Sequence, residues 1–150
     1  MKKFCFQRKK KGVSFVEVLT VIAIIGILAS IGISGLSSFK TRNDFLLSIE
    51  QIQNTLRLAR MKAMYGSNDD NWGVSITASQ VLIFKGNNSA TRNVSYDQTV
   101  SLSGVESISG LTSVVFSKMS GLPSNTGTIF ISDGNEDKII EINEKGMVLK

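Results

Sequence analysis

The chain has 150 residues, a formal net charge of +5, no histidine and a single cysteine, Cys5. Without histidine it has no imidazole for acid and base catalysis and none of the usual histidine-containing zinc sites. Six of the 17 basic residues, and none of the 12 acidic ones, precede Gly12, so the positive charge is a feature of the N-terminus and is no argument for nucleic-acid binding.

A long apolar run follows the basic N-terminus. After the single acid Glu17, the 22 residues from Val18 to Phe39 carry no charge. As a helix rising about 1.5 Å per residue they span roughly 33 Å, enough for a hydrocarbon core of about 30 Å. The lysines and arginines in front of this run predict that the leader stays in the cytoplasm and that the part after Phe39 lies across the membrane.

A processing site is predicted at the end of the leader. A secretory signal peptide carries its apolar region before the cleavage site and loses it, whereas here Gly12 lies on the charged side of the run. Cleavage between Gly12 and Val13 therefore keeps the apolar helix. It leaves 11 basic and 12 acidic residues, a net charge of −1, and no cysteine, so the mature fold is expected to stand without disulfides.

The segment from Gly12 to Ala29, GVSFVEVLTVIAIIGILA, closely resembles the prepilin motif shared by type IV pilins and the pseudopilins of type II secretion. The resemblance implies cleavage after Gly12 by a prepilin peptidase, N-methylation of Val13, and assembly into a filament with the apolar helices at its centre. It also implies partners: other pilin or pseudopilin subunits and an assembly platform in the inner membrane. Val13 stands where the family most often has phenylalanine, and Phe15 where it often has leucine.

Glu17 is the one acid at the start of this apolar helix. A carboxylate inside a bilayer is costly, by about a few kcal/mol, and usually pairs or marks function. After cleavage the new amine of Val13 lies four residues earlier on the same helix face, so Glu17 can pair within its own chain or with the amine of a neighbouring subunit. The resemblance favours the neighbour and gives Glu17 a role in assembly register. Methylation keeps the positive charge of the amine.

The next segment predicts a second, amphipathic helix half. Gly32, Ser34 and the serines up to Ser38 predict a flexible or locally melted stretch. From Asp44 to Tyr65, apolar residues then recur at spacings of four and three, with Gly66 as the C-terminal stop. These stripe residues, which should pack on a soluble domain, are Phe45, Ile49, Ile52, Leu56, Ala59 and Ala63; Gln53 is among the polar residues placed off the stripe.

After the helix, short apolar or alternating runs separated by turn residues predict antiparallel strands. The predicted strands are residues 72–77, 80–85, 92–96, 99–102, 113–118, 127–132 and 138–143, with a short piece at 147–149. The fold class is therefore α+β: a long N-terminal α-helix packed on a C-terminal antiparallel β-sheet domain. The predicted organisation is a cleaved leader at 1–12, a membrane or filament-core helix at 13–39, an amphipathic half at 40–66 and a β-rich head at 67–150.

Two short regions narrow the resemblance. The helix end LRLARMKAM at residues 56–64, and the order of strands, glycines and a terminal glycine turn after Val114, resemble the GspH/FimT-type minor pseudopilins and pilins. This implies a minor filament subunit. Some FimT-like minor pilins take up DNA through an arginine-rich C-terminal segment, so DNA binding is the alternative function. Its candidate residues here are Arg57, Arg60, Lys62, Lys145 and Lys150, few cations for contacts whose affinity rises with the number of phosphates neutralised.

The hairpin region after Ser132 offers the one candidate metal site. Asp133, Asn135 and Asp137 supply oxygen ligands at alternate positions, as at the start of a calcium loop. Lys138, however, occupies the place that needs glycine, and the alternative is a polar turn between two strands. No nucleophile elbow, phosphate-binding glycine loop or paired carboxylates are present, so neither an enzyme nor a cofactor is expected.

Overall fold

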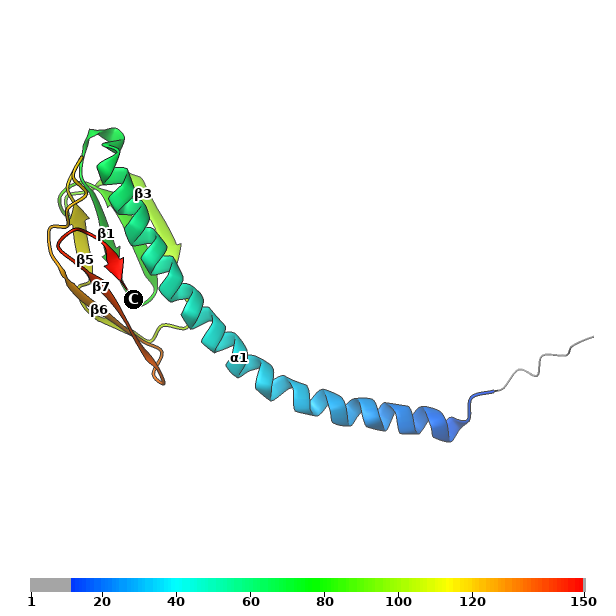
Figure 1. The fold of residues 1–150 in the computed structure, drawn as a ribbon. Coiled ribbons are helices and arrows are strands. Elements are labelled where there is room, and N and C mark those ends of the chain that lie inside the picture. Colours follow the sequence, from blue (N-terminus) through cyan, green and yellow to red (C-terminus); the bar gives the residue numbers. More distant parts are fainter. Residues whose placement is uncertain (1–11, 150) are drawn as a thin grey trace, which may run out of the picture. The chain divides into compact units, whose positions relative to one another are not determined.

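The computed structural model describes residues 12–149, and within residues 30–38 it describes the helical backbone alone. Contacts divide the chain into two compact units, one ending at Phe39 and the other beginning at Lys40. One long helix, α1 (Phe15–Met64), supplies residues to both (Figure 1). The stretch predicted to melt around Gly32 is helical in the structure, so that prediction is wrong. The penalty for glycine in a helix, about 1 kcal/mol, is too small here to interrupt a helix of 50 residues.

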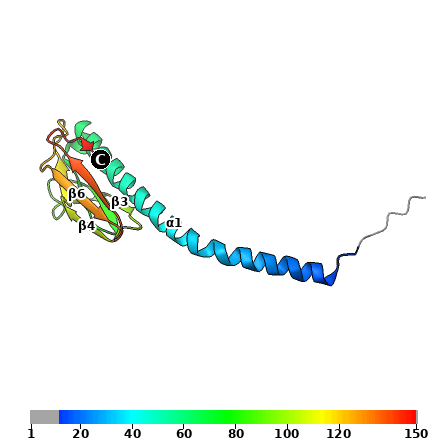
Figure 2. The ribbon, with the colours of Figure 1, turned by 60° about the horizontal axis from the view of Figure 1, so that its bottom comes forward.

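The head, from Lys40 onward, contains two four-stranded sheets in which all the strand pairs are antiparallel. The first sheet has the order β3 (Asn93–Ser101), β2 (Gln80–Lys85), β1 (Trp72–Ile76) and β5 (Ser113–Phe116). The second has the order β4 (Ser107–Gly110), β6 (Gly127–Ser132), β7 (Asp137–Ile142) and β8 (Val148–Leu149). Figure 2 shows β4 and β6 side by side in this second sheet. Together with α1 this is the predicted α+β fold.

The core of the head joins the stripe of α1 to the inward faces of both sheets. All six predicted stripe residues, from Phe45 to Ala63, are at most 3% exposed, and they belong to one cluster with β-strand residues such as Val74, Phe116, Ile131 and Ile140. The predicted stripe is therefore confirmed. Gln53, placed off the stripe by the pattern, is buried as well, because it lies one turn after Ile49 at the border of the stripe.

Polar contacts fix α1 to loops of the head at both ends of the stripe. The buried hydroxyl of Ser48 donates to the carbonyl of Ser103 at 2.7 Å and accepts from the N–H of Ser103 at 2.9 Å. At the other end, the N–H of Met119 donates to the carbonyl of Ala63 at 2.8 Å. The helix stops as predicted at Gly66, which has a left-handed φ of 62° and precedes the short 3-10 helix η1 (Ser67–Asp69).

The strands differ from the predicted ones in two places. The predicted strands 92–96 and 99–102 are one strand, β3, because Asp97 and Gln98 between them continue the extended backbone, with a register irregularity opposite Ile83 and Lys85. Strand β4 was not predicted at all. Its sequence, Ser-Ile-Ser-Gly, has one apolar residue, and the strand forms by pairing with β6.

Candidate functional site

The predicted cleavage site lies in exposed, non-helical backbone immediately before α1. Gly12, Val13 and Ser14 precede the helix, whose first bonds run from the N–H groups of Glu17 and Val18 to the carbonyl of Ser14, at 3.0 and 3.2 Å. No other atoms lie within 4 Å of the position that a Cβ on Gly12 would occupy. The fold therefore makes no demand for glycine here, so a requirement for Gly12 would come from recognition by another molecule.

Glu17 lies in the first turn of α1, where the partial positive charge of the helix N-terminus favours a carboxylate. Its side chain is exposed and lines a shallow depression of about 220 Å³ with Val13, Val18, Val21 and Ile22. Among residues 12–149 no ion pair to Glu17 is formed. In the uncleaved chain the nitrogen of Val13 is an amide, so the predicted pairing needs cleavage first, and the role of Glu17 stays a prediction.

The start of α1 exposes apolar side chains in every direction. These side chains are Phe15, Val16, Val18, Leu19, Val21, Ile22, Ile24, Ile25, Ile27 and Leu28, each at least 45% exposed. An all-round apolar helix is normally covered by protein or lipid. Within the part of the chain that the structure describes, no helix is both long and apolar enough to cross a membrane. The predicted membrane segment at 13–39 is thus not confirmed by the structure.

The candidate calcium residues form a hairpin turn between β6 and β7. Ser132 pairs with Asp137, and Oδ1 of Asp133 accepts the N–H groups of Asn135 at 2.9 Å and Glu136 at 2.7 Å. These two bonds, that from Glu136 first, hold the pKa of Asp133 below its ordinary value. Asp133 is therefore already occupied in stabilising the turn. The described residues contain no group of three acidic, histidine or cysteine side chains that could hold a metal ion.

The candidate DNA residues do not act together as free cations. The guanidinium of Arg60 donates to the carbonyl of Lys145 at 2.7 Å and to that of Gly121 at 3.4 Å, which links the end of α1 to two loops. Lys62 lies over the ring of Trp72 with its Nζ 4.3 Å from the centroid, and partial burial lowers its pKa. Arg57 and Lys145 remain exposed. Lys150 lies outside the described residues.

Sequence reasoning missed an apolar groove at the end of α1. The groove has a volume of about 330 Å³ and is lined by Arg57, Arg60, Met61, Met64, Gly146, Met147 and Val148. Arg57, Met61 and Met64 are spaced by four and three residues, so they share one face of α1. That spacing was a signal in the sequence for a second apolar face of the same helix, which is exposed and lies beside the buried stripe.

It also missed an exposed aromatic residue on the second sheet. Phe130 is 50% exposed although its neighbours Ile129 and Ile131 are fully buried. Phe130 pairs with the equally exposed Ile139 across β6 and β7. A strand with one face in water should alternate, so the unbroken run Ile129-Phe130-Ile131 was a signal that one apolar side chain would be left uncovered.

Comparisons with known proteins bear on the N-terminal segment alone. Residues 7–33 match the family model described as the prokaryotic N-terminal methylation motif. No curated protein and no solved structure matches the chain. The matched segment includes Gly12, Val13 and Glu17, and it supports assignment of the chain to the superfamily of type IV pilins and pseudopilins.

Proposed function

We propose that this chain is a non-enzymatic filament subunit, a minor pilin or pseudopilin that assembles through α1. The observation that carries the proposal is the N-terminal methylation motif at residues 7–33. Two features of the fold support it. The predicted scissile bond is in exposed backbone ahead of the helix, and the large apolar side chains described at the start of α1 are exposed.

Maturation would take two covalent steps at the nitrogen of Val13. A prepilin peptidase adds water across the Gly12–Val13 peptide bond, which releases the leader as a carboxylate and leaves Val13 as a free amine. A methyl group from a sulfonium methyl donor then replaces one proton of that amine; the donor leaves as a thioether and the proton passes to water. The methylated amine keeps its positive charge and is available to a carboxylate.

Glu17 would set the register between subunits in the filament. Its position in the first helical turn places the carboxylate beside the apolar side chains of Val13, Val18 and Val21. In such surroundings an unpaired charge is unfavourable, so bringing the carboxylate to the amine of a neighbouring Val13 stabilises one axial stagger of the helices over others.

The apolar part of α1 would be held by lipid before assembly and by other helices afterwards. The uncharged run from Val18 to Phe39 and the basic leader before it support an anchor in the inner membrane, with the leader in the cytoplasm. The partners that this requires are other pilin or pseudopilin subunits, the peptidase and an assembly platform. A place among the GspH/FimT-type minor subunits rests on the resemblance of residues 56–64 and of the strand pattern.

DNA binding is the less favoured alternative. Of its five candidate residues, Arg60 and Lys62 already bind carbonyls and an indole ring within the head. A basic surface with few free cations neutralises few phosphates. Nothing in the geometry of the head favours nucleic acid over a protein partner.

Mass spectrometry of the N-terminus of the protein isolated from cells tests the proposed function. The expected species begins at Val13 and carries one methyl group. In a Gly12→Leu variant we expect the unprocessed chain with its leader, while a Gly26→Leu variant should be processed normally. Both glycines have open space around the added side chain, so folding does not distinguish them. Any other start in the parent protein would contradict the proposal.

A further inference from the structure

Three segments that are distant in sequence build the groove at the end of α1. The helix supplies Met61 and Met64, the C-terminal turn supplies Met147, and all three are nearly half exposed. Gly121, in the loop after β5, lies directly against Met64, because a Cβ there would be 2.4 Å from Cγ of Met64. The thioether side chains are flexible and polarisable, and they make favourable contacts with the edge of an aromatic ring.

The rim of this methionine groove is basic. Arg57 lies one turn before Met61 on the exposed face of α1. Unlike Arg60, whose guanidinium is held by two carbonyls, Arg57 makes no hydrogen bond or ion pair with any residue from 12 to 149. The groove therefore offers an apolar floor and one free guanidinium, and it fits an aromatic group with a carboxylate close beside it.

The outer face of the second sheet carries that combination. Phe130 projects beside a hollow of about 360 Å³, whose other lining residues include Ser107, Ser109, Ser132 and Asp137. Asp137 lies diagonally across the β6–β7 pair from Phe130, since Phe130 pairs with Ile139 and Ser132 with Asp137. Such diagonal positions are about 7–8 Å apart, and neighbours on one helix face are about 5–6 Å apart, so the long side chain of Arg57 can make up the difference.

We infer that the methionine groove of one copy of this chain receives Phe130 of a second copy, with Arg57 entering the hollow beside Phe130 to bind Asp137. The guanidinium would find the carboxylate of Asp137 and the hydroxyls of Ser107 and Ser109 as acceptors. The patch presents a protruding Phe130 and the acid Asp137, and the groove presents an apolar hollow and the base Arg57. The two surfaces are therefore complementary in form and in charge, and both belong to this one chain.

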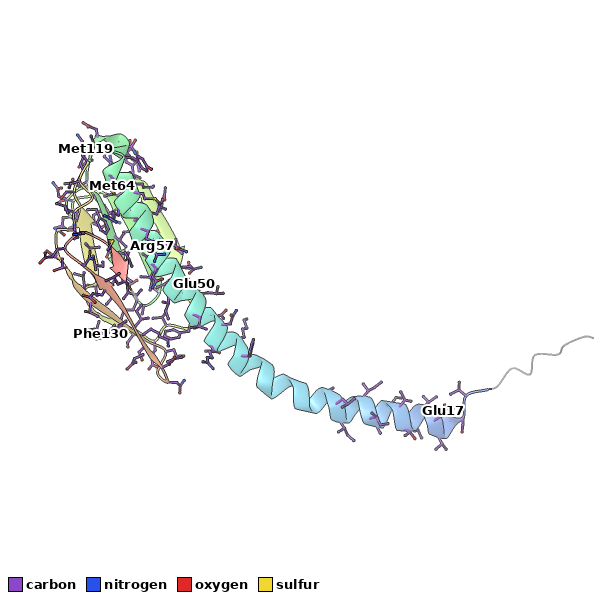
Figure 3. All side chains as sticks on the ribbon, in the orientation of Figure 1. Glu17, Glu50, Arg57, Met64, Met119 and Phe130 are labelled. Carbon is purple, nitrogen blue, oxygen red and sulfur yellow. The ribbon has the colours of Figure 1, made fainter. Side chains whose placement is uncertain are left out.

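The two surfaces cannot satisfy each other within one molecule. Figure 3 shows Phe130 well separated from Arg57, Met64 and Met119 on the head. A contact between two different patches is heterologous, so after two copies bind, the copy whose groove is filled still has a free Phe130 and the other copy still has a free groove. The head therefore carries a means of joining copies in an open series. This deepens the proposed function by naming the partner of the head, but it involves neither Gly12 nor Glu17.

Crosslinking of the purified full chain in detergent tests this contact. In a Cys5→Ser background, Asn54→Cys places a thiol one turn before Arg57, and Ser109→Cys places one opposite Phe130. A short bismaleimide should join the two single-cysteine chains into heterodimers when they are mixed, and neither chain alone. The chain with both cysteines should give a ladder of multimers. In the control mixtures, a chain with Asn88→Cys, in the exposed loop after β2, takes the place of the Asn54→Cys chain or of the Ser109→Cys chain.

Charge reversal supplies a second, independent test. Arg57→Glu or Asp137→Arg alone should lower the yield of heterodimer about tenfold, and the two together should restore it, since each 1.4 kcal/mol of pairing energy corresponds to a factor of ten. Arg57→Glu combined with Asp70→Arg should not restore it. Absence of the heterodimer, an equal yield with Asn88→Cys, or no restoration by the double reversal would overturn the contact.

The test also separates this contact from filament assembly. Adding Glu17→Leu to the cysteine chains should leave the heterodimer unchanged, because the contact lies wholly on the head. Loss of methylation at Val13 would refute the proposed function without affecting the crosslink. Loss of the crosslink with normal methylation would refute the head contact alone.

Discussion

The two ends of α1 show how one helix meets two different environments. Near its start, from Phe15 to Leu28, apolar side chains point in all directions and every large one is at least 45% exposed. From Phe45 to Ala63, six apolar side chains at spacings of four and three form a narrow stripe that is at most 3% exposed, with charged residues such as Glu50 and Arg57 on the other side. The second pattern is satisfied within the head, whereas the first requires a partner or lipid.

This difference between the two parts of α1 predicts which substitutions affect folding and which affect assembly. Substitutions near the start of α1 remove no contact within the head, so their effects should appear only when the subunit meets others. Substitutions in the stripe remove core contacts, so their effects should appear in the stability of the isolated subunit.

The largest effect is expected for Glu17→Leu. Without the carboxylate, the amine of a neighbouring Val13 has no partner, and we expect filament incorporation to be lost while the protein remains in the membrane fraction. Glu50→Leu, an exposed acid on the second half of α1, is the control and should enter filaments normally. The measurement is immunoblotting of sheared filaments against membranes, and normal incorporation of Glu17→Leu would remove the register role.

A large difference in stability is expected between two isoleucines on the same helix. Ile52→Ala creates a cavity under a fully buried side chain and should lower the free energy of unfolding by about 2–5 kcal/mol. Ile24→Ala, at a residue that is 51% exposed, should change it by less than about 0.5 kcal/mol. Urea unfolding followed by fluorescence of Trp72, the single tryptophan, measures both. Equal effects would show that the start of α1 is packed in the subunit.

A smaller loss of folding stability is expected for Ser48→Ala. The substitution removes both the donor to the carbonyl and the acceptor for the N–H of Ser103, leaving partly buried polar groups unsatisfied at a cost of about 1–3 kcal/mol. Ser109→Ala, at an exposed serine of β4, serves as the control for loss of a hydroxyl. The same urea titration applies, and equal midpoints for the two variants would mean that the bond between α1 and Ser103 does not stabilise the head.

The smallest effect on stability is expected for Asp133→Asn, and it depends on pH through the pKa of Asp133. Because the N–H groups of Glu136 and Asn135 lower this pKa in the folded state, the stabilisation is present above about pH 4 and is lost as pH falls through the folded value. Asp133→Asn should reduce the pH dependence of the urea midpoint between pH 5 and pH 2. The change is small because water screens an exposed carboxylate. Parallel curves for parent and variant would contradict it.

The periodicity of apolar residues predicted the buried face of α1 accurately, because residues that pack on the core must recur on one side of the helix. The spacing from Phe45 to Ala63 placed six apolar residues on one helix face, and this face is the one buried in the core. Gly66 marked the end of the helix. Alternation located seven of the eight strands, although it divided β3 into two. It failed for β4, whose Ser-Ile-Ser-Gly sequence has little intrinsic preference and depends on pairing with residues some twenty positions later in β6.

Surface features were less predictable than the core. The methionine groove forms because Arg60 ties two distant loops to α1, and neither the carbonyl of Gly121 nor that of Lys145 is visible in a pattern of side chains. Arg60 itself was assigned to a basic patch, since a charged residue on a helix face normally reaches into water. The N-terminal motif was recognisable because it is a short, continuous sequence, and residues 7–33 match the methylation-motif model; cleavage after Gly12 and the role of Glu17 stay predictions.

The distribution of the core also has a consequence for the order of events in the life of the molecule. Among the described residues, every buried hydrophobic side chain lies at or beyond Phe45, more than thirty residues after the proposed cleavage site. If the leader is removed as proposed, the precursor and the processed subunit would share the same folded head. Folding of that head would then impose no timing on removal of the leader, and a single cut would commit an already folded subunit to assembly.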